Sequence, residues 1–242
     1  MNLIIDQGNS VCKVAVADGG ELIAHYSFPQ VSLREAGVIL SDHPALQAAI
    51  YSSVAAVDKM LLSLLAERIP TVLQVDEHIA VPVSVAYDRK RLGSDRMAAV
   101  VGAHALAPEG VSLLVIDLGT AITYEQISPK GEYTGGNISP GLYTRLKALN
   151  HFTLRLPLIH EITPPVRDFG QTTSEAITAG VLRGVIYEIK GYIDEAKASD
   201  PNVKVYVTGG DAPLIEQYLP EEVCVEPDLV LYGLNKILEY NR

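Results

Sequence analysis

The sequence predicts an α/β protein whose two halves follow one plan. Residues 3–10 read LIIDQGNS and residues 114–121 read LVIDLGTA, so an apolar strand ending in Asp-x-Gly occurs twice. Strand-like runs, followed by alternating helices and strands, come after each copy. A late strand ends in Thr-Gly-Gly at residues 208–210. These observations predict a duplicated fold in which each half holds a mixed sheet flanked by helices.

The first half opens with three predicted antiparallel strands, because Asp18-Gly19-Gly20 is a hairpin turn signal. The helix expected at 58–68 has Leu61, Leu64 and Leu65 on one face and Asp58 near its start, where the helix dipole favours a carboxylate. The predicted strands share short apolar runs and lie at 2–5, 11–17, 21–28, 49–54 and 71–75. This half is therefore expected to continue as alternating α/β structure.

The second half repeats the plan after residues 107–110, where Ala-Pro-Glu-Gly interrupts two apolar patterns. Its predicted strands lie at 112–117, at 121–127, from Glu132, at 203–207 and at 223–226. Its predicted helices lie at 141–150, at 174–197 (one long helix or two in sequence), at 212–218 and at 232–240. We therefore expect two lobes, residues 1–108 and residues 109–242.

Composition argues against several classes of partner. The 242-residue chain has a formal net charge of −10, which disfavours binding to a nucleic-acid backbone or to an anionic membrane. No apolar run approaches the ~20 residues of a membrane span, and no secretory signal follows Met1. Cys12 and Cys224 lie in apolar runs and are expected to be buried free thiols. The sequence therefore predicts a cytoplasmic protein.

The two Asp-x-Gly turns indicate phosphate chemistry. Glycine lets the backbone approach a ligand closely at Gly8 and Gly119, because it has no side chain to obstruct that approach. A carboxylate such as Asp6 can hold Mg²⁺ beside the phosphates. Lys13 follows one hairpin strand later, and from there its ammonium could return to them. Hydroxyl, amide and N–H groups that suit an anion follow the turns at Asn9, Ser10 and Thr120.

The order of these turns resembles that of the superfamily of actin, the sugar kinases and the heat-shock ATPases. The resemblance implies a duplicated ribonuclease-H-like (actin-like ATPase) fold, with the nucleotide in the cleft between two lobes. It also implies that Gly209 and Gly210, in the late Thr-Gly-Gly turn, allow close approach of the adenosine.

Six ordered motifs carry a closer resemblance. They are D-x-G-N-[ST]-x-x-K at 6–13, G-x-D-R at 93–96, D-x-G-T-A-x-T at 117–123, G-G-x-I-x-P-G at 135–141, T-x-x-A-I-x-x-G at 173–180 and P-x-L-x-L-x-G-L at 227–234. In these motifs the chain resembles the type III pantothenate kinases over nearly its whole length. The resemblance implies transfer of the γ-phosphoryl group of ATP to the 4′-hydroxyl of pantothenate, the first step of coenzyme A biosynthesis.

The same resemblance implies roles for individual residues. Asp95, at the start of an Ala-rich helix, is the expected catalytic base, and Arg96 is expected to hold the pantothenate carboxylate in a two-bond contact. The implied ATP-binding residues are Asp6, Gly8, Asn9, Ser10, Lys13, Thr120, Gly209 and Gly210. The implied pantothenate-binding residues are Tyr87, Gly93, Ser94, Asp95, Arg96 and Thr173. The implied metal ligands are Asp6 for Mg²⁺, and Asp117 with Glu125 for a monovalent cation, K⁺ or NH₄⁺.

Simpler interpretations of the same residues are open. Asp6 could cap its turn through Asx geometry, and Lys13 could be a solvated strand residue. Ser94 or Asp95 could cap the helix, which would leave Arg96 as a surface charge. Two other functions carry the same fold, namely another small-molecule kinase of the superfamily and a non-catalytic transcription accessory regulator.

Three positions depart from the family pattern. Glu125 stands where the family usually has Asp, Thr172 where it commonly has Asn, and Tyr87 lacks the nearby proline that many members carry. Glu125 bears on cation binding, and the other two bear on the edge of the pantothenate pocket.

The resemblance also implies a homodimer in which each pantothenate pocket lies near the subunit boundary. An apolar stripe of Ile177, Val181 and Val185 runs beside two glycines that would permit close approach of a partner helix. Packing of this stripe into the chain's own core is the alternative.

Overall fold

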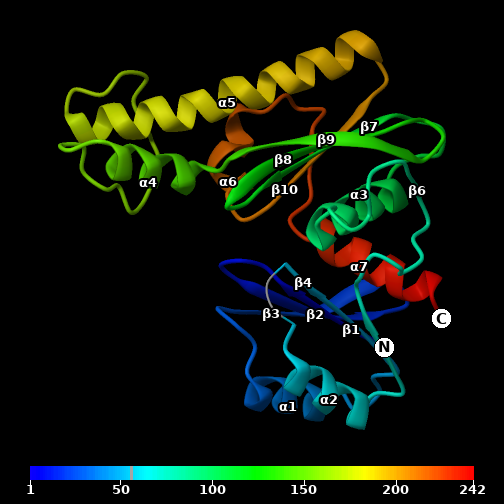
Figure 1. Cartoon of the computed structure of the whole chain (residues 1–242). Coiled ribbons are helices and arrows are strands. Elements are labelled where there is room, and N and C mark those ends of the chain that lie inside the picture. Colours follow the sequence, from blue (N-terminus) through cyan, green and yellow to red (C-terminus); the bar gives the residue numbers. More distant parts are fainter. Residues whose placement is uncertain (55–56) are drawn as a thin grey trace. The chain divides into compact units, whose positions relative to one another are not determined.

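The computed structural model describes residues 1–54 and 57–242, and within them the chain divides into two compact units (Figure 1). The first unit combines three segments of the chain, Met1–Pro108, Gly131–Thr134 and Asp228–Arg242. The second unit combines Glu109–Lys130 and Gly135–Pro227. The last residues of the chain therefore complete the first unit.

The first unit is built on a five-stranded sheet with the strand order β3-β2-β1-β4-β5. Its first three strands are antiparallel neighbours, as predicted, while β4 and β5 run parallel to β1. The strands of this sheet are β1 (Asn2–Gln7), β2 (Cys12–Asp18), β3 (Glu21–Phe28), β4 (Ala48–Ser53) and β5 (Thr71–Gln74), and the short strand β6 (Ser84–Val85) lies outside it. Its helices are α1 (Leu33–Asp42), α2 (Lys59–Arg68), α3 (Ser94–Leu106) and α7 (Leu229–Tyr240).

Side chains of this sheet point alternately to its two faces, and each face carries apolar residues. Helices therefore cover both faces. Leu3 and Ile5 of β1 join apolar residues of α1 and α2 in one buried cluster, and the two helices lie together beside the sheet in Figure 1. Asn2 points to the opposite face, where its amide donates a 2.8 Å hydrogen bond to Asn235 of α7. The polar residue that ends β1 on this second face, Asp6, is thereby directed toward the side of the sheet that α7 covers.

The backbones of α3 and α7 touch at two glycines. A Cβ atom on Gly102 would lie 2.2 Å from the carbonyl oxygen of Leu229, and one on Gly233 would lie 1.8 Å from the carbonyl oxygen of Ala98. Only glycine permits such an approach. Gly233 is the glycine of the last sequence motif, so that motif has a structural reason in the packing of α7 on α3.

The second unit is built on the strands of a second mixed sheet, whose order is β11-β10-β7-β8-β9-β6. β7 and β8 form an antiparallel hairpin, while β10 runs parallel to β7 and β11 runs parallel to β10. The strands are β7 (Leu113–Leu118), β8 (Ala121–Ile127), β9 (Glu132–Pro140), β10 (Lys204–Thr208) and β11 (Cys224–Val225). The helices are α4 (Leu142–Phe152), α5 (Thr173–Ser199), α6 (Ala212–Ile215) and a 3₁₀ turn at Glu216–Tyr218.

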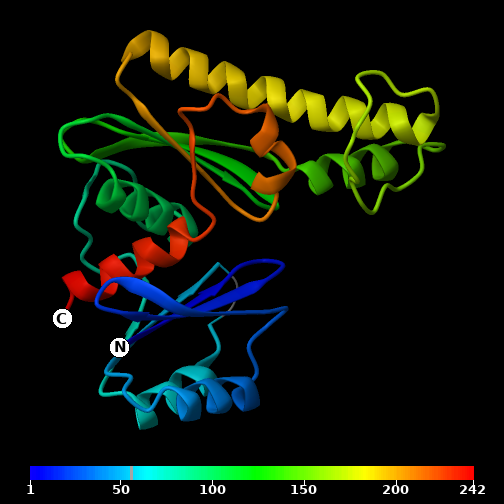
Figure 2. The ribbon, with the colours of Figure 1, turned by 180° about the vertical axis from the view of Figure 1, so that it is seen from behind.

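The long helix α5 covers one face of this sheet in both views (Figures 1 and 2). Alternate apolar residues of β7 and β8, including Ile116 and Tyr124, pack under it in one buried cluster. Ile177, Val181 and Val185 belong to the same cluster. The apolar stripe of α5 therefore packs into the chain's own core, which was the alternative to a partner helix.

The predicted mixed sheets with flanking helices are confirmed, with a few local differences. Neither α1 nor the short strand β6 was predicted from the sequence. Cys12 is buried as expected, but Cys224 is exposed, because β11 is a two-residue strand at the edge of its sheet. Across residues 1–54 and 57–242, no helix is both long and apolar enough to cross a bilayer.

Candidate active site

Three polar side chains form a row across the first sheet. Asp6 at the end of β1 lies directly opposite Lys13 of β2 and directly opposite Ser52 of β4. Residues paired in this way point to the same face of a sheet. The Asp-x-Gly motif and the lysine seven residues later therefore meet because of the hairpin register, as expected from the sequence.

Asp6 lies in an environment that opposes its charge. Burial, together with the charge of Asp95, raises its pKa from 3.8 to about 6, although a hydrogen bond from Ser52 and the charge of Lys13 act in the opposite direction. Its Oδ1 atom is buried and makes no hydrogen bond within the described residues. An enclosed carboxylate oxygen without a partner is costly for the folded protein, and a bound cation or phosphate-linked water would satisfy it.

The turn after Asp6 holds the other predicted phosphate ligands. The N–H of Gly8 donates a 3.0 Å hydrogen bond to the carbonyl oxygen of Val11, and a Cβ atom on Gly8 would come equally close to that oxygen. Asn9 and Ser10 are exposed at the tip of the turn. The turn is thus closed by its own backbone and presents its polar groups outward.

The raised pKa of Asp6 leads to a stability prediction. Because the folded-state pKa lies above the unfolded value of 3.8, this carboxyl group stabilises the fold below about pH 4 and loses that contribution as the pH rises through about 6. Replacing Asp6→Asn should therefore raise the free energy of unfolding at pH 8 by about 1–3 kcal/mol and leave it nearly unchanged at pH 4. Urea unfolding at both pH values measures this, with the exposed Asp18→Asn as the control. A gain of equal size at both pH values would contradict the electrostatic cause.

The start of α3 brings the G-x-D-R motif to the same region. The hydroxyl of Ser52, which faces Asp6, is joined to the hydroxyl of Ser94 by a 2.9 Å hydrogen bond. The N-cap residue of α3 is Gly93, and no side chain caps this helix start in the described structure. Asp95 instead accepts a 2.8 Å hydrogen bond from the N–H of Arg96, the next residue. The interpretation of Ser94 or Asp95 as the helix cap is therefore not supported.

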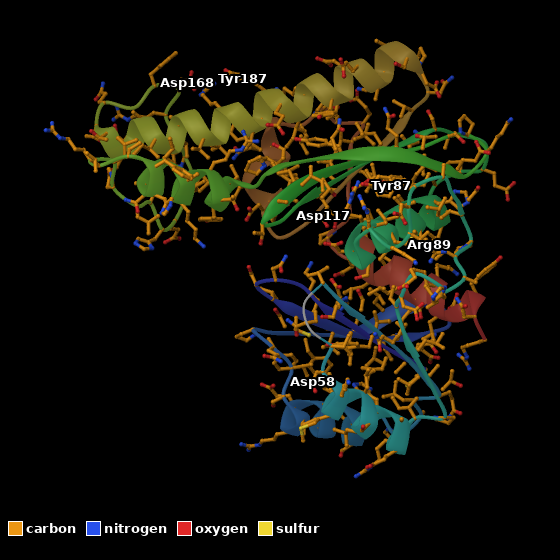
Figure 3. All side chains as sticks on the ribbon, viewed as in Figure 1. Asp58, Tyr87, Arg89, Asp117, Asp168 and Tyr187 are labelled. Carbon is orange, nitrogen blue, oxygen red and sulfur yellow. The ribbon has the colours of Figure 1, made fainter. Side chains whose placement is uncertain are left out.

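Arg96 is buried, with only 6% of its surface exposed, so it is not a surface charge. Its guanidinium donates a 2.9 Å hydrogen bond to the hydroxyl of Tyr133 and lies 5.5 Å from the centre of the Tyr87 ring. The cation–π contact and the hydrogen bond together anchor the planar group to two aromatic residues. Figure 3 labels Tyr87, whose ring is partly exposed. Sequence reasoning missed Tyr133, which lies two residues before the Gly-Gly motif and carries no signal of its own.

The second unit holds a separate group of polar residues on one face of its sheet. Asp117, labelled in Figure 3, pairs with Thr123 of β8 and with Thr208 of β10. Glu125 lies two residues beyond Thr123, on the same face, and is fully buried. The Oγ1 atom of Thr123 is buried without a hydrogen-bond partner in the described residues. Two carboxylates and an unsatisfied hydroxyl together provide the oxygen ligands that a monovalent cation prefers.

The two glycines of the Thr-Gly-Gly turn differ in their surroundings. Gly209 has a φ of +98°, and a Cβ atom there would lie 2.5 Å from the Oδ1 atom of Asp117. Gly210 faces open space within the described structure. Gly209 is therefore required for packing against the end of β7, and Gly210 leaves room beside it.

Thr120 and Thr173 complete the predicted set. Thr120 is exposed in the turn between β7 and β8, and its carbonyl oxygen accepts hydrogen bonds from the N–H of Gly141 and the hydroxyl of Thr144. Thr173 is the exposed first residue of α5, directly after the N-cap Thr172. The first unit thus brings together Asp6, Lys13, Tyr87 and the 93–96 motif, while the second holds Asp117, Thr120, Glu125, Gly209 and, at the start of α5, Thr173.

Comparisons with known proteins show which family the chain resembles over its whole length. A family model described as type III pantothenate kinase matches residues 2–195. The chain is similar to the type III pantothenate kinases of Porphyromonas gingivalis strain W83 and Bacteroides fragilis strain YCH46. It is 46% identical to the first, over 99% of this chain and 98% of the relative. It is 43% identical to the second, over 100% of this chain and 98% of the relative.

Solved structures support the fold. A Campylobacter jejuni protein described under the Baf family of transcriptional activators superposes with a TM-score of 0.63 at 24% identity, over 99% of this chain and 98% of that one. A glucokinase from an Antarctic psychrotroph gives 0.53 at 12% identity over 99% and 98%. An archaeal actin homologue gives 0.51 at 11% identity over 99% of both chains. These likenesses confirm the duplicated actin-like fold predicted from the paired turns.

Proposed function

We propose roles for the site residues of this chain, which belongs to the type III pantothenate kinase family and transfers a phosphoryl group from ATP to pantothenate. The observation that carries the assignment is the start of α3, where Asp95 stands beside a buried arginine and is coupled electrostatically to Asp6. A regulator without catalysis is not favoured, because whole-length relatives at 36–46% identity are named as kinases.

Asp95 acts as the general base in this proposal. Its carboxylate accepts the proton of the pantothenate 4′-hydroxyl as the hydroxyl oxygen forms a bond to the γ-phosphorus, and the bond from that phosphorus to the β,γ-bridging oxygen breaks to release ADP. Arg96 binds the pantothenate carboxylate. Tyr87 and Tyr133 support this role, because a cation–π contact and a hydrogen bond anchor the guanidinium and fix its direction.

The phosphates of ATP are assigned to the Asp-x-Gly turns. The backbone N–H groups at Asn9 and Ser10, with the ammonium of Lys13, neutralise phosphate charge, and Gly8 closes the turn that presents them. Thr120 contributes at the other Asp-x-Gly turn, and Gly209 with Gly210 receives the adenosine. The unsatisfied Oδ1 atom of Asp6 supports its role in holding Mg²⁺, which when bound would neutralise charge on the phosphates.

Arg96→Lys tests the assignment of the carboxylate site. A lysine keeps the charge but loses the planar fork, so the KM for pantothenate should rise by about 10–100-fold while the KM for ATP changes little. Steady-state kinetics with each substrate varied in turn measure both constants. Arg91→Lys, at an exposed position in the same unit, is the control. A rise in the KM for ATP instead would assign Arg96 to the phosphate site.

A monovalent cation, K⁺ or NH₄⁺, is proposed at Asp117, with Glu125 and Thr123 as further ligands. The buried hydroxyl of Thr123, which has no hydrogen-bond partner in the described residues, supports this choice of ligands. The register of the β7–β8 hairpin places Thr123 directly opposite Asp117. The cation would offset the charge that carboxylates and ATP phosphates bring to one place.

A homodimer is also proposed, although the stripe of α5 no longer supports it. The second unit exposes large apolar side chains elsewhere, at Phe152, Leu154, Phe169 and Tyr187. Phe152 also lines a groove of about 530 Å³ along α4 and α5, together with Leu149 and Val181. Exposed apolar groups of this kind are typical of a surface that a partner covers.

The cytoplasm stays the predicted compartment.

Kinase assays in K⁺, NH₄⁺ and Na⁺, beside light scattering, test the cation and the dimer together. Wild-type protein should release ADP only when pantothenate is present, with higher activity in K⁺ or NH₄⁺ than in Na⁺, and should scatter light as a dimer. Thr123→Val should raise the half-saturating concentration of the activating cation without changing the dimer. A fully active monomer in Na⁺ alone would refute both proposals.

A further inference from the structure

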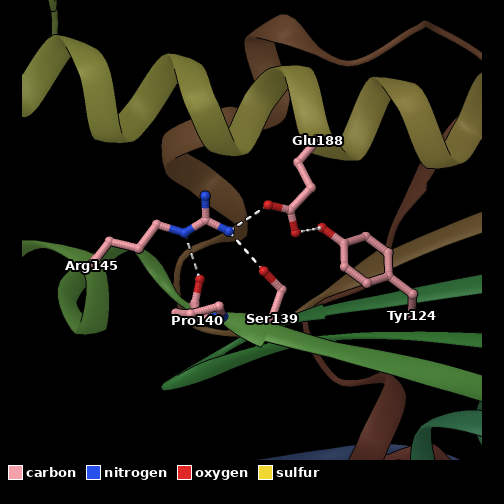
Figure 4. A network of polar contacts seen from close by, with 5 residues as sticks. All are labelled: Tyr124, Ser139, Pro140, Arg145 and Glu188. Atoms are coloured by element: carbon pink, nitrogen blue, oxygen red, sulfur yellow. Dashed lines mark hydrogen bonds and ion pairs between the residues drawn. The ribbon is translucent and has the colours of Figure 1, made fainter. Parts of the chain in front are cut away.

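A charged network joins α5 to the segment that leads into α4 (Figure 4). The guanidinium of Arg145 on α4 bonds to Glu188 of α5 at 2.5 Å, to the hydroxyl of Ser139 at 2.8 Å and to the carbonyl oxygen of Pro140 at 2.7 Å. Tyr124 of β8 donates a 2.8 Å hydrogen bond to the other oxygen of Glu188. Both carboxylate oxygens of Glu188, and the Nε and Nη2 groups of Arg145, therefore have specific partners.

The ion pair is fixed and stays charged. Burial would raise the pKa of Glu188, but hydrogen bonds from Arg145, Ser139 and Tyr124 outweigh it and hold that pKa below its usual value. Both side chains are about three-quarters buried. The ring of Tyr124 stacks on Tyr192 with 3.7 Å between the ring centres, so the donor to Glu188 cannot swing away. Such a pair is worth more than an exposed one, because water screens it less.

The network fixes the segment that contacts the second Asp-x-Gly turn, at Gly119 and Thr120. Gly141 directly follows Pro140, and its N–H donates a 3.1 Å hydrogen bond to the carbonyl oxygen of Thr120. The hydroxyl of Thr144 donates a second bond to the same oxygen at 2.6 Å. A Cβ atom on Gly141 would lie 2.1 Å from the carbonyl oxygen of Gly119, so the two segments are in backbone contact. A shift of Pro140 would therefore shift the turn.

No side chain caps the start of α4 within the described structure, so this junction depends on other contacts. We propose that Arg145 and Glu188 are positioning residues for ATP: they fix the junction of β9 and α4 and thereby orient the groups that Thr120 presents to the phosphates. The inference rests on the proposed contact of Thr120 with ATP. Neither residue touches substrate in this proposal, and neither belongs to a motif quoted from the sequence.

The test compares three variants by steady-state kinetics and thermal unfolding. Glu188→Gln removes the charge that holds Arg145 and should raise the KM for ATP about tenfold, with the KM for pantothenate nearly unchanged. Tyr124→Phe removes only the hydrogen bond that orients Glu188 and should raise the KM for ATP about two- to fourfold. Glu222→Gln is the matched control, since it removes the ion pair with Lys197 elsewhere on α5 and should leave both constants unchanged.

Thr120→Val separates failure of this inference from failure of its premise. If Thr120→Val raises the KM for ATP but neither Glu188→Gln nor Tyr124→Phe does, the pair serves stability alone and the inference is overturned. If Thr120→Val, Glu188→Gln and Tyr124→Phe all leave the KM for ATP unchanged, both the proposed role of Thr120 and the inference are overturned. A rise for Glu188→Gln without one for Thr120→Val supports positioning through the backbone N–H groups of the turn. Equal rises in both KM values for Glu188→Gln would indicate general distortion and overturn the proposal. Should Glu188→Gln fail to fold, Tyr124→Phe decides by the same criterion.

Discussion

Replacing Asp95→Asn is expected to lower kcat by about 10²–10⁴-fold, the range for loss of a general base. Asparagine keeps the size of the side chain and its acceptor oxygen, so the hydrogen bond from the N–H of Arg96 can persist. It cannot accept the proton of the substrate hydroxyl. Because phosphoryl transfer has a loose transition state with little need for a strong nucleophile, we expect the loss near the lower end of that range.

The measurement is kcat with both substrates saturating, beside pantothenate binding by calorimetry. Binding should stay close to that of the wild type, because Arg96 is retained. Asp42→Asn, an exposed carboxylate on α1, is the control and should leave kcat unchanged. Unchanged kcat in Asp95→Asn would mean that the carboxylate only organises the start of α3.

Gly233→Ala is expected to be the most destabilising single methyl addition in the chain, with a loss of about 3 kcal/mol or more. The added Cβ atom would lie 1.8 Å from the carbonyl oxygen of Ala98, and backbone cannot move aside as a flexible side chain can. Helices α3 and α7 would have to separate, and α3 carries Asp95 and Arg96 at its start. Activity should therefore fall together with stability.

Gly191→Ala is the matched control for this prediction. Gly191 lies on an exposed part of α5, and a Cβ atom there would have no described atom outside its own stretch of helix within 4 Å. Alanine there should raise the free energy of unfolding by about 0.4–1 kcal/mol, because it restricts the unfolded chain and favours the helix. Urea unfolding of the two variants measures both effects. A Gly233→Ala protein as stable as the wild type would show that the two helices can part at little cost.

The first half of the candidate site could be predicted from the sequence because its geometry is local. Asp6 and Lys13 lie in one hairpin, so the distance between them follows from the turn that joins the strands. The G-x-D-R motif is likewise one helix start. The strands were predictable for the same reason, since alternation of apolar residues is a property of each strand by itself.

The residues that the sequence did not reveal are those whose contacts depend on partners far along the chain. Tyr133 meets Arg96 only because β9 begins beside β6 and the start of α3. Glu188 meets Arg145 only when α5 is laid over the sheet. The stripe of Ile177 and Val181 has the same periodicity whether it faces its own core or a partner, so spacing could not choose between them.

The crossing of α3 and α7 also bears on how the protein is made. Residues up to Pro108 leave the ribosome first, yet the helix that packs on α3 belongs to Asp228–Arg242. At a translation rate of ~5–20 residues per second, the first unit waits on the order of ten seconds for its last piece. During that interval the glycine-bearing face of α3 lacks the helix that covers it in the folded unit. The closing helix thus makes folding of the first unit a late event of synthesis, although most of its residues are translated first.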